Sequence, residues 1–179
     1  RRETWVESVG RYMDFMKENV GDKLGDEEYR EVREAILWQR VMPSMRLLWG
    51  AGKAARKTNV CAYNCSYIAP TRLEDFAEIM YLSMCGAGVG FSAESHAVQR
   101  LPIVERQTGR HEGVFVIEDN KEGWGDALTK GLKIWFGGHD IEFDYSKLRP
   151  AGARLGTMGG RSSGPDPLRG LLDFWKVWW

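Results

Sequence analysis

Two cysteines in the stretch NVCAYNCSYIAP, at positions 59–70, are the first candidates for chemistry. Cys61 and Cys65 are separated by three residues, and thiols at this spacing could bind a metal, form a disulfide, or provide one reactive thiol beside an idle neighbour. The run from 60 to 68 is rich in β-formers and predicts a strand. Residues four apart on a strand lie roughly 13 Å apart. Since a disulfide needs Cα atoms within about 7 Å, the strand prediction excludes a bridge between them.

A zinc site at these cysteines is disfavoured because further ligands are missing at suitable spacing. The remaining ligand-type residues stand alone in the sequence: Cys85, His96, His111 and His139. Two interpretations of the cysteines therefore stay open. They are small apolar residues of a core, or one of them is a working thiol.

The glycines of CGAGVGFS, at 85–92, invite a dinucleotide or phosphate-loop interpretation, because closely spaced glycines let backbone N–H groups approach a pyrophosphate. In the dinucleotide fingerprint, however, the glycines follow a strand and open a helix. Here they follow a predicted helix and lead into an extended piece, and no GK[ST] sequence is present. The pattern favours a tight turn.

The stretch GGRSSGPDP, at 159–167, combines flexible glycines, an arginine with a planar fork of donors, and two serine hydroxyls. Such a loop could wrap around a base or a phosphate. A solvated connection between two elements explains the same composition, so both interpretations remain.

Composition narrows the class of protein that holds these stretches. Of 179 residues, 43% are hydrophobic, and 25 basic residues balance 25 acidic ones. This balance gives no global field toward nucleic acid or a membrane, so neither partner is expected. The apolar runs are short and three cysteines do not make a secreted disulfide framework, so we expect reduced thiols and a cytoplasmic location.

Periodicity predicts the elements that must position these residues. Helices are expected at 4–20, 26–40, 71–85 with Thr71 as its cap, 122–136 and from Leu168 onward; strands at 60–68 and 140–145; a hairpin-like piece at 111–119; and loops at 50–58 and 150–167. The alternation of strands and helices after residue 41 predicts an α/β architecture with parallel strands. We assign 1–40 as a helical segment and 41–179 as the first portion of an α/β domain.

Four stretches in this order resemble the catalytic core of ribonucleotide reductase large subunits, most closely the adenosylcobalamin-dependent class II enzymes: MPSMRLLWGAG, NCSYIAP, MCGAGVGFS and LRPAGARLGTMGGRSSGPDPL. The resemblance implies a ten-stranded α/β barrel. It also implies thiyl-radical conversion of ribonucleotides to 2′-deoxyribonucleotides, with a cysteine pair as reductant.

The resemblance also implies roles for individual residues. Cys65 matches the first cysteine of the reducing pair and, with Ser44, Asn64 and Gly88, the substrate site. The other two cysteines are then packing residues. The specificity loop, which links effector and substrate base, matches Gly159, Gly160, Arg161, Ser162 and Ser163.

Complete enzymes of this type carry the radical cysteine and the second reducing cysteine downstream, so the resemblance implies that this chain is an N-terminal fragment, inactive alone. Adenosylcobalamin is the implied cofactor, bound mainly by regions outside the chain. The implied partners are a ribonucleotide substrate, a deoxynucleotide or ATP effector, and a thioredoxin-like reductant. Two alternatives stay open: a non-enzymatic nucleotide-binding module, or a di-iron-dependent class I subunit.

Overall fold

A computed structural model describes residues 1–156 and 159–178 of the chain. It divides into two compact units, Arg1–Asn64 and Cys65–Trp179. The sequence placed a boundary near residue 40, whereas the structure places the division after Asn64. The reason is that the short helices after residue 40 pack with the N-terminal helices. None of the described helices combines the length and the apolar composition that a membrane span requires.

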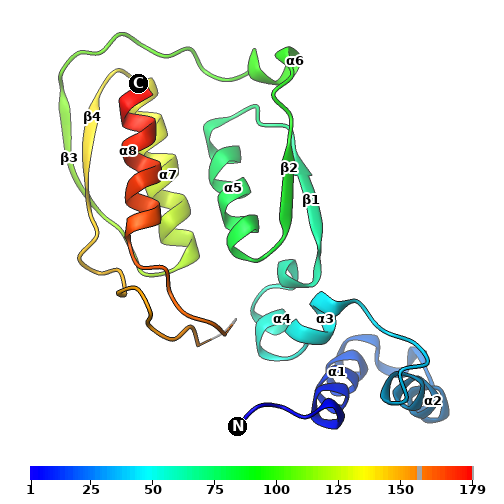
Figure 1. The fold of residues 1–179 in the computed structure, drawn as a ribbon. Helices are drawn as coiled ribbons and strands as arrows, with labels where there is room; N and C mark the ends of the chain where they lie inside the picture. The colour runs from blue at the N-terminus through cyan, green and yellow to red at the C-terminus, as the bar shows by residue number, and fades with distance from the viewer. Residues whose placement is uncertain (157–158, 179) are drawn as a thin grey trace. The chain divides into compact units, whose positions relative to one another are not determined.

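The first unit is entirely helical (Figure 1). Its elements are α1 (Trp5–Val20), η1 (Gly21–Lys23), α2 (Asp26–Leu37), α3 (Met45–Gly50), α4 (Lys53–Lys57) and η2 (Asn59–Ala62). The first helix begins at a capping box, in which the Thr4 hydroxyl accepts from the Glu7 N–H and the Glu7 carboxylate accepts from the Thr4 N–H. Hydrogen bonds from the Arg1 side chain and the Thr4 backbone lower the pKa of Glu7 to about 2. The two predicted N-terminal helices are thus confirmed.

The predicted loop at 50–58 is wrong, because residues Lys53–Lys57 form helix α4. Tertiary contacts explain the helix. Ala54 and Ala55 of α4 are buried within the unit. Arg56 of α4 forms an ion pair with Glu18 of α1. These contacts outweigh the weak helical signal of a short, glycine-flanked sequence.

The predicted strand at 60–68 is also partly wrong. Residues Asn59–Ala62 form the 3₁₀ helix η2, and the strand comprises only Cys65–Ile68. Cys61 is buried in η2, where its thiol donates to the carbonyl oxygen of Thr58 at 3.2 Å. The argument that Cys61 and Cys65 lie on one strand, and are too far apart along it for a disulfide, therefore does not apply.

The second unit contains two parallel strand pairs, each connected through a helix (Figure 1). The first βαβ half is β1 (Cys65–Ile68), α5 (Leu73–Met84) and β2 (Gly88–Phe91); the second is β3 (His111–Val116), α7 (Lys121–Phe136) and β4 (Asp140–Asp144). Helix α6 (Ser95–Val98) lies between the halves in the sequence, and α8 (Asp166–Trp178) follows the second. The predicted α/β character with parallel strands is confirmed in these two small sheets.

The hairpin-like interpretation of 111–119 is wrong, because β3 is a single strand that pairs in parallel with β4. The register is interrupted between His111 and Val114. Gly113 lies in this interruption with φ of +91°, a conformation that favours glycine. The turn-like sequence signal thus reflects an irregularity within one strand rather than a reversal of the chain.

Helix α5 begins one residue later than the sequence suggested. The predicted cap, Thr71, instead donates its backbone N–H to the carboxylate of Asp75 at 2.8 Å, and Arg72 does the same at 3.0 Å. Burial of Asp75 raises its pKa, but these hydrogen bonds and one from the Arg72 side chain lower it by more, so the net shift is downward. An acidic residue at the third helical position therefore fixes the helix start.

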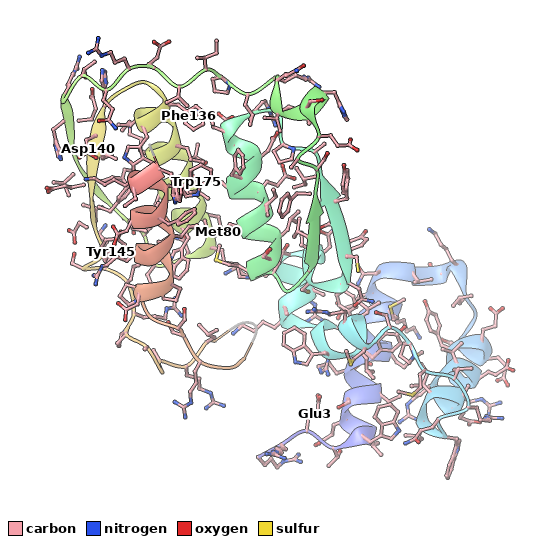
Figure 2. All side chains as sticks on the ribbon, turned by 45° about the horizontal axis from the view of Figure 1, so that its top comes forward. Glu3, Met80, Phe136, Asp140, Tyr145 and Trp175 are labelled. Atoms are coloured by element: carbon pink, nitrogen blue, oxygen red, sulfur yellow. The ribbon has the colours of Figure 1, made fainter. Side chains whose placement is uncertain are left out.

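A hydrophobic core joins the helices of the second unit. Its buried residues are Leu73, Ile117, Ala127, Leu128, Leu132, Trp135, Ile141, Leu148, Leu168 and Leu172. Helix α5 packs on α7, and α7 packs on α8. Met80 and Trp175, which are labelled in Figure 2, pack against this cluster, and the Trp175 ring meets Phe76 edge to face at 5.6 Å. All but one of the buried residues come from positions 117–172.

Candidate functional site

The first strand pair brings two of the predicted site residues together. In the parallel register, Cys65 of β1 lies opposite Gly88 of β2, and Tyr67 lies opposite Gly90. Neighbouring strands are about 4.8 Å apart, and alternate residues point to the same face. Cys65, Gly88, Tyr67 and Gly90 therefore line one face of this sheet, which we call the thiol face.

The thiol face is open within the structure. Cys65 and Gly88 are exposed. The alternate residues of β1, Ser66 and Ile68, point to the opposite face and are half-buried. Helix α5 packs against both strands. Because both β2 residues of this face are glycines, β2 presents no side chain beside the Cys65 thiol.

The turn between α5 and β2 sets this arrangement. Cys85 ends the helix with its thiol buried, and it accepts a hydrogen bond from the Lys121 ammonium at 3.4 Å. Gly86 follows with φ of +91°, which lets the chain reverse into β2. The interpretation of CGAGVGFS as a turn that follows a helix and leads into an extended piece is thus confirmed.

Two predicted substrate residues, Ser44 and Asn64, belong to the first unit. Ser44 precedes α3 and is exposed, and its side chain makes no capping hydrogen bond to that helix. Asn64 is exposed at the end of the unit, directly before Cys65 in the sequence. Ser44 and Asn64 therefore lie in the first unit, whereas the residues of the thiol face lie in the second.

The predicted specificity loop connects β4 to α8, and hydrogen bonds between its own backbone groups hold part of it together. Arg154 and Arg161 form an isolated antiparallel bridge. The Ser162 N–H donates to the carbonyl of Ala153 at 2.7 Å, and the Gly152 N–H donates to the carbonyl of Ser162 at 2.8 Å. The loop therefore contains a narrow two-stranded ribbon.

The side chain of Arg161 lies on this ribbon, where Nη1 donates to the carbonyl oxygen of Gly152 at 2.9 Å. Gly159 and Gly160 adopt φ of +71° and +81°, so the turn requires residues without a Cβ atom. Ser163 is exposed. Thr157 and Met158 of the predicted loop lie outside the described residues.

Two features of the second unit were missed by sequence reasoning. Tyr67 lies on the thiol face, and counting two residues from Cys65 along a strand would have found it. The other is a cavity of about 250 Å³, lined by Trp135, Ile141, Glu142, Phe143, Tyr145, Arg169, Leu172, Asp173 and Lys176. It lies between β4 and α8, and since it depends on how distant segments pack, no local pattern signals it.

The cavity lining is charged on its α8 side. The Lys176 ammonium forms an ion pair with Asp140 at 2.7 Å, and the Arg169 guanidinium lies over the Tyr145 ring at 4.8 Å from its centroid. Burial of Asp140 raises its pKa, but hydrogen bonds from Lys176 and the Ile141 N–H lower it by more. Asp140 and Tyr145 are labelled in Figure 2.

Fold and site together describe an α/β protein with an exposed thiol on a glycine-lined sheet face. Sequence similarity to known proteins narrows the class further. The chain is 33% identical to the adenosylcobalamin-dependent ribonucleoside-triphosphate reductase of Euglena gracilis, over 94% of the chain and 26% of that protein. It is 25% identical to the protein of the same name from Lactobacillus helveticus, over 94% of the chain and 32% of that protein. The chain is thus a homologue of adenosylcobalamin-dependent ribonucleoside-triphosphate reductases along nearly its whole length, as its four motifs predicted.

The other comparisons found no relative. No family model matches the chain, and no solved structure matches it. The chain spans about a quarter to a third of the length of the curated relatives it matches.

Adenosylcobalamin does not fit the cavity between β4 and α8. The cavity of the second unit, at about 250 Å³, is smaller than the roughly 300–1,000 Å³ of pockets that hold drug-sized ligands, and a corrin is larger than such ligands.

Proposed function

We propose that this chain is part of a ribonucleoside-triphosphate reductase that depends on adenosylcobalamin, and that Cys65 is one of the two cysteines that reduce the substrate. The observation that carries the proposal is the exposed Cys65 thiol opposite Gly88 on an open sheet face. Similarity to reductases along 94% of the chain supports it. The cofactor named for these relatives favours the adenosylcobalamin-dependent enzymes over the di-iron-dependent ones.

The proposed reaction uses Cys65 as a source of one electron and one proton. Thiyl-radical chemistry, started at a cysteine outside this chain, activates the ribose. The bond between C2′ and its hydroxyl oxygen breaks, the oxygen leaves as water, and a C2′–H bond forms. Two thiols, Cys65 and a partner outside the chain, together supply two electrons and two protons and close to a disulfide. A thioredoxin-like dithiol then reopens that disulfide.

The glycines of the thiol face have a clear purpose in this proposal. A ribose must approach the Cys65 sulfur closely, and Gly88, directly opposite it, presents only backbone to the sugar. The Ser44 hydroxyl, which does not cap its helix, would donate to the substrate phosphates. Asn64, next to Cys65 in the sequence, completes the proposed substrate residues.

The ribbon at 150–164 is proposed as the specificity loop. Arg161, with Gly159, Gly160, Ser162 and Ser163, would contact the substrate base or its neighbours. An effector, a deoxynucleotide or ATP, would select among loop conformations if its contacts differ between them. The hydrogen bond of Arg161 to Gly152 represents one such conformation.

We further propose that the two parallel strand pairs contribute to a ten-stranded α/β barrel in the complete protein. Within the described part of the chain each sheet has two strands and thus has unpaired edges, which larger α/β folds cover with further strands. Segments outside this chain would provide those strands and hold the adenosylcobalamin. The reaction would take place in the cytoplasm.

The test uses the complete polypeptide that contains this chain. It is supplied with adenosylcobalamin, ribonucleoside triphosphates and a thioredoxin-type dithiol, and deoxynucleotide formation is measured. Cys65→Ser should lower turnover by at least about 100-fold, equivalent to about 2.7 kcal/mol in the activation barrier, without weakening nucleotide binding. Cys61→Ser, the matched control at a buried cysteine, should retain turnover within a few-fold. Undiminished turnover with Cys65→Ser, or no reduction by the wild-type protein with the cofactor present, would overturn the proposal.

A further inference from the structure

Tyr67 is a large aromatic side chain in an unusual setting. It lies two residues from Cys65 on β1, on the same face of the sheet, and its partner on β2 is Gly90. Its exposed fraction is 66%. Neighbouring side chains of β1 that point the other way, Ser66 and Ile68, are half-buried toward α5. Tyr67 thus takes no part in the core of its own unit.

The ring of Tyr67 leans across the strand pair. A Cβ atom placed on Gly90 would lie 3.6 Å from Cδ2 of Tyr67, which is ordinary van der Waals contact. The ring therefore lies beside the bare backbone of Gly90. The thiol face consequently has the Cys65 thiol and the exposed Tyr67 ring side by side on β1, next to the bare glycine backbone of β2.

The spacing of these parts matches a nucleotide. Tyr67 is two residues along the strand from Cys65, so their Cα atoms are roughly 6.6 Å apart. In a ribonucleotide the base is attached to C1′, the carbon next to the reacting C2′. A ribose positioned over Cys65 and Gly88 would therefore bring its base within reach of the Tyr67 ring.

We infer that Tyr67 is a substrate-binding residue, whose ring stacks on the base of the ribonucleotide while the ribose lies against Gly88 at the Cys65 thiol. This inference rests on the proposed function of the same face. Aromatic rings are general partners of bases, because every base presents a π-face. Stacking on one ring holds all four bases without reading their edges, which leaves the choice among them to the specificity loop.

The inference also predicts for which substrates the Tyr67 ring contributes most to binding. Purines present two fused rings to an aromatic partner and pyrimidines present one. The contribution of Tyr67 to binding should therefore be larger for GTP than for CTP. A residue that does not contact the base would contribute equally to both.

The first experiment uses steady-state kinetics of the complete reductase with two variants. Tyr67→Phe keeps the aromatic face and should leave KM within about twofold. Tyr67→Leu keeps apolar bulk without that face and should raise KM by roughly 5- to 150-fold, the range that loss of one base-stacking contact produces, with the larger increase for GTP. At saturating substrate, kcat should change little. An unchanged KM for Tyr67→Leu, or equal increases for GTP and CTP, overturns the inference.

The second experiment needs no variant and so does not depend on how Tyr67→Leu folds. Hydroxyl-radical footprinting of the wild-type complete protein, read by mass spectrometry, measures how accessible the Tyr67 ring is. Saturating GTP should slow oxidation of Tyr67 several-fold, whereas inorganic tripolyphosphate, which has no base, should not. Equal protection by both ligands, no protection by GTP, or a ring that is inaccessible without ligand contradicts the inference.

Different results would disprove the reductase role of Cys65 and the stacking role of Tyr67. If Cys65→Ser abolishes turnover while Tyr67→Leu leaves KM unchanged, the reductase assignment stands and the stacking role is wrong. If Cys65→Ser leaves turnover intact, the proposed function is wrong, and GTP protection of Tyr67 then reports only nucleotide binding.

Discussion

The two βαβ halves of the second unit have the same topology and different construction. The half with β3, α7 and β4 contains most of the buried core, including Leu132 and Trp135 of α7. The half with β1, α5 and β2 has two buried residues in its helix, one of which is the carboxylate Asp75, and one sheet face that is open. Stability in this unit thus resides mainly in the second half. The first half contributes less to the core, and its open sheet face exposes the Cys65 thiol.

The largest expected effect is loss of stability in the second half. Leu132 is fully buried in α7, so Leu132→Ala removes apolar contacts and leaves a cavity, at a cost of about 2–5 kcal/mol. Native-state hydrogen exchange of α7 amides in the complete polypeptide measures this cost as a local opening free energy. A cost below about 1 kcal/mol would show that the core does not depend on this half.

A smaller effect comes from a matched pair of glycines in α7. A Cβ atom on Gly131 would lie 2.9 Å from the Trp135 ring and 3.1 Å from the Phe143 ring, whereas one on Gly125 would lie 3.8 Å from Ala77. Gly131→Ala should therefore destabilise by about 1–3 kcal/mol through overpacking. Gly125→Ala should stabilise by about 0.5–1 kcal/mol, because alanine is the better helix former. The same exchange measurement compares them, and equal effects would contradict the packing described for Gly131.

The helix start of the first half should respond to pH. The pKa of Asp75 is lowered in the folded state, so its carboxylate stabilises the protein above the unfolded pKa of about 3.9, and this contribution is lost as the pH falls through the folded pKa. Asp75→Asn should cost about 1 kcal/mol at pH 7. The cost should shrink below about pH 4, as measured by thermal unfolding of both proteins across that range. A cost independent of pH would contradict the role of the charge.

The smallest effect is expected at Ser66. Among residues 1–156 and 159–178, its hydroxyl oxygen is the buried side-chain polar atom that lacks a hydrogen-bond partner, and such a group is unfavourable. Ser66→Ala should be neutral or should stabilise the protein by up to about 1 kcal/mol. Thermal unfolding tests this, and a loss of more than 1 kcal/mol would mean that the hydroxyl has a partner in the complete protein.

The sequence was most informative where a pattern is local. Helices α1 and α7 follow from apolar residues at three- and four-residue steps, and the glycine turn before β2 follows from composition. Helix α4 was missed because Ala54 and Ala55 are buried against other segments of the unit, and no local pattern contains such packing. The parallel pairing of β3 with β4 was missed for the same reason, since the partner strands are separated by a whole helix.

The candidate site was predictable only in part. Motif resemblance pointed to Cys65 and Gly88 separately, and their opposition in register became visible only with the pairing of β1 and β2. The strand prediction placed Cys61 on the same strand as Cys65, but the chain turns through η2 before β1 begins. Parallel registers depend on how a connecting helix packs, which periodicity in one segment does not contain.

The most direct test of the central claim follows the redox state of Cys65 through one turnover. The complete polypeptide is reduced, freed of dithiol, and allowed to convert one equivalent of ribonucleoside triphosphate in the presence of adenosylcobalamin. Its thiols are then alkylated and mapped by mass spectrometry. The account predicts that Cys65 is recovered in a disulfide with a cysteine outside this chain, in proportion to the deoxynucleotide formed, while Cys85 is recovered as a thiol. Deoxynucleotide formation with Cys65 still alkylated as a free thiol would contradict it.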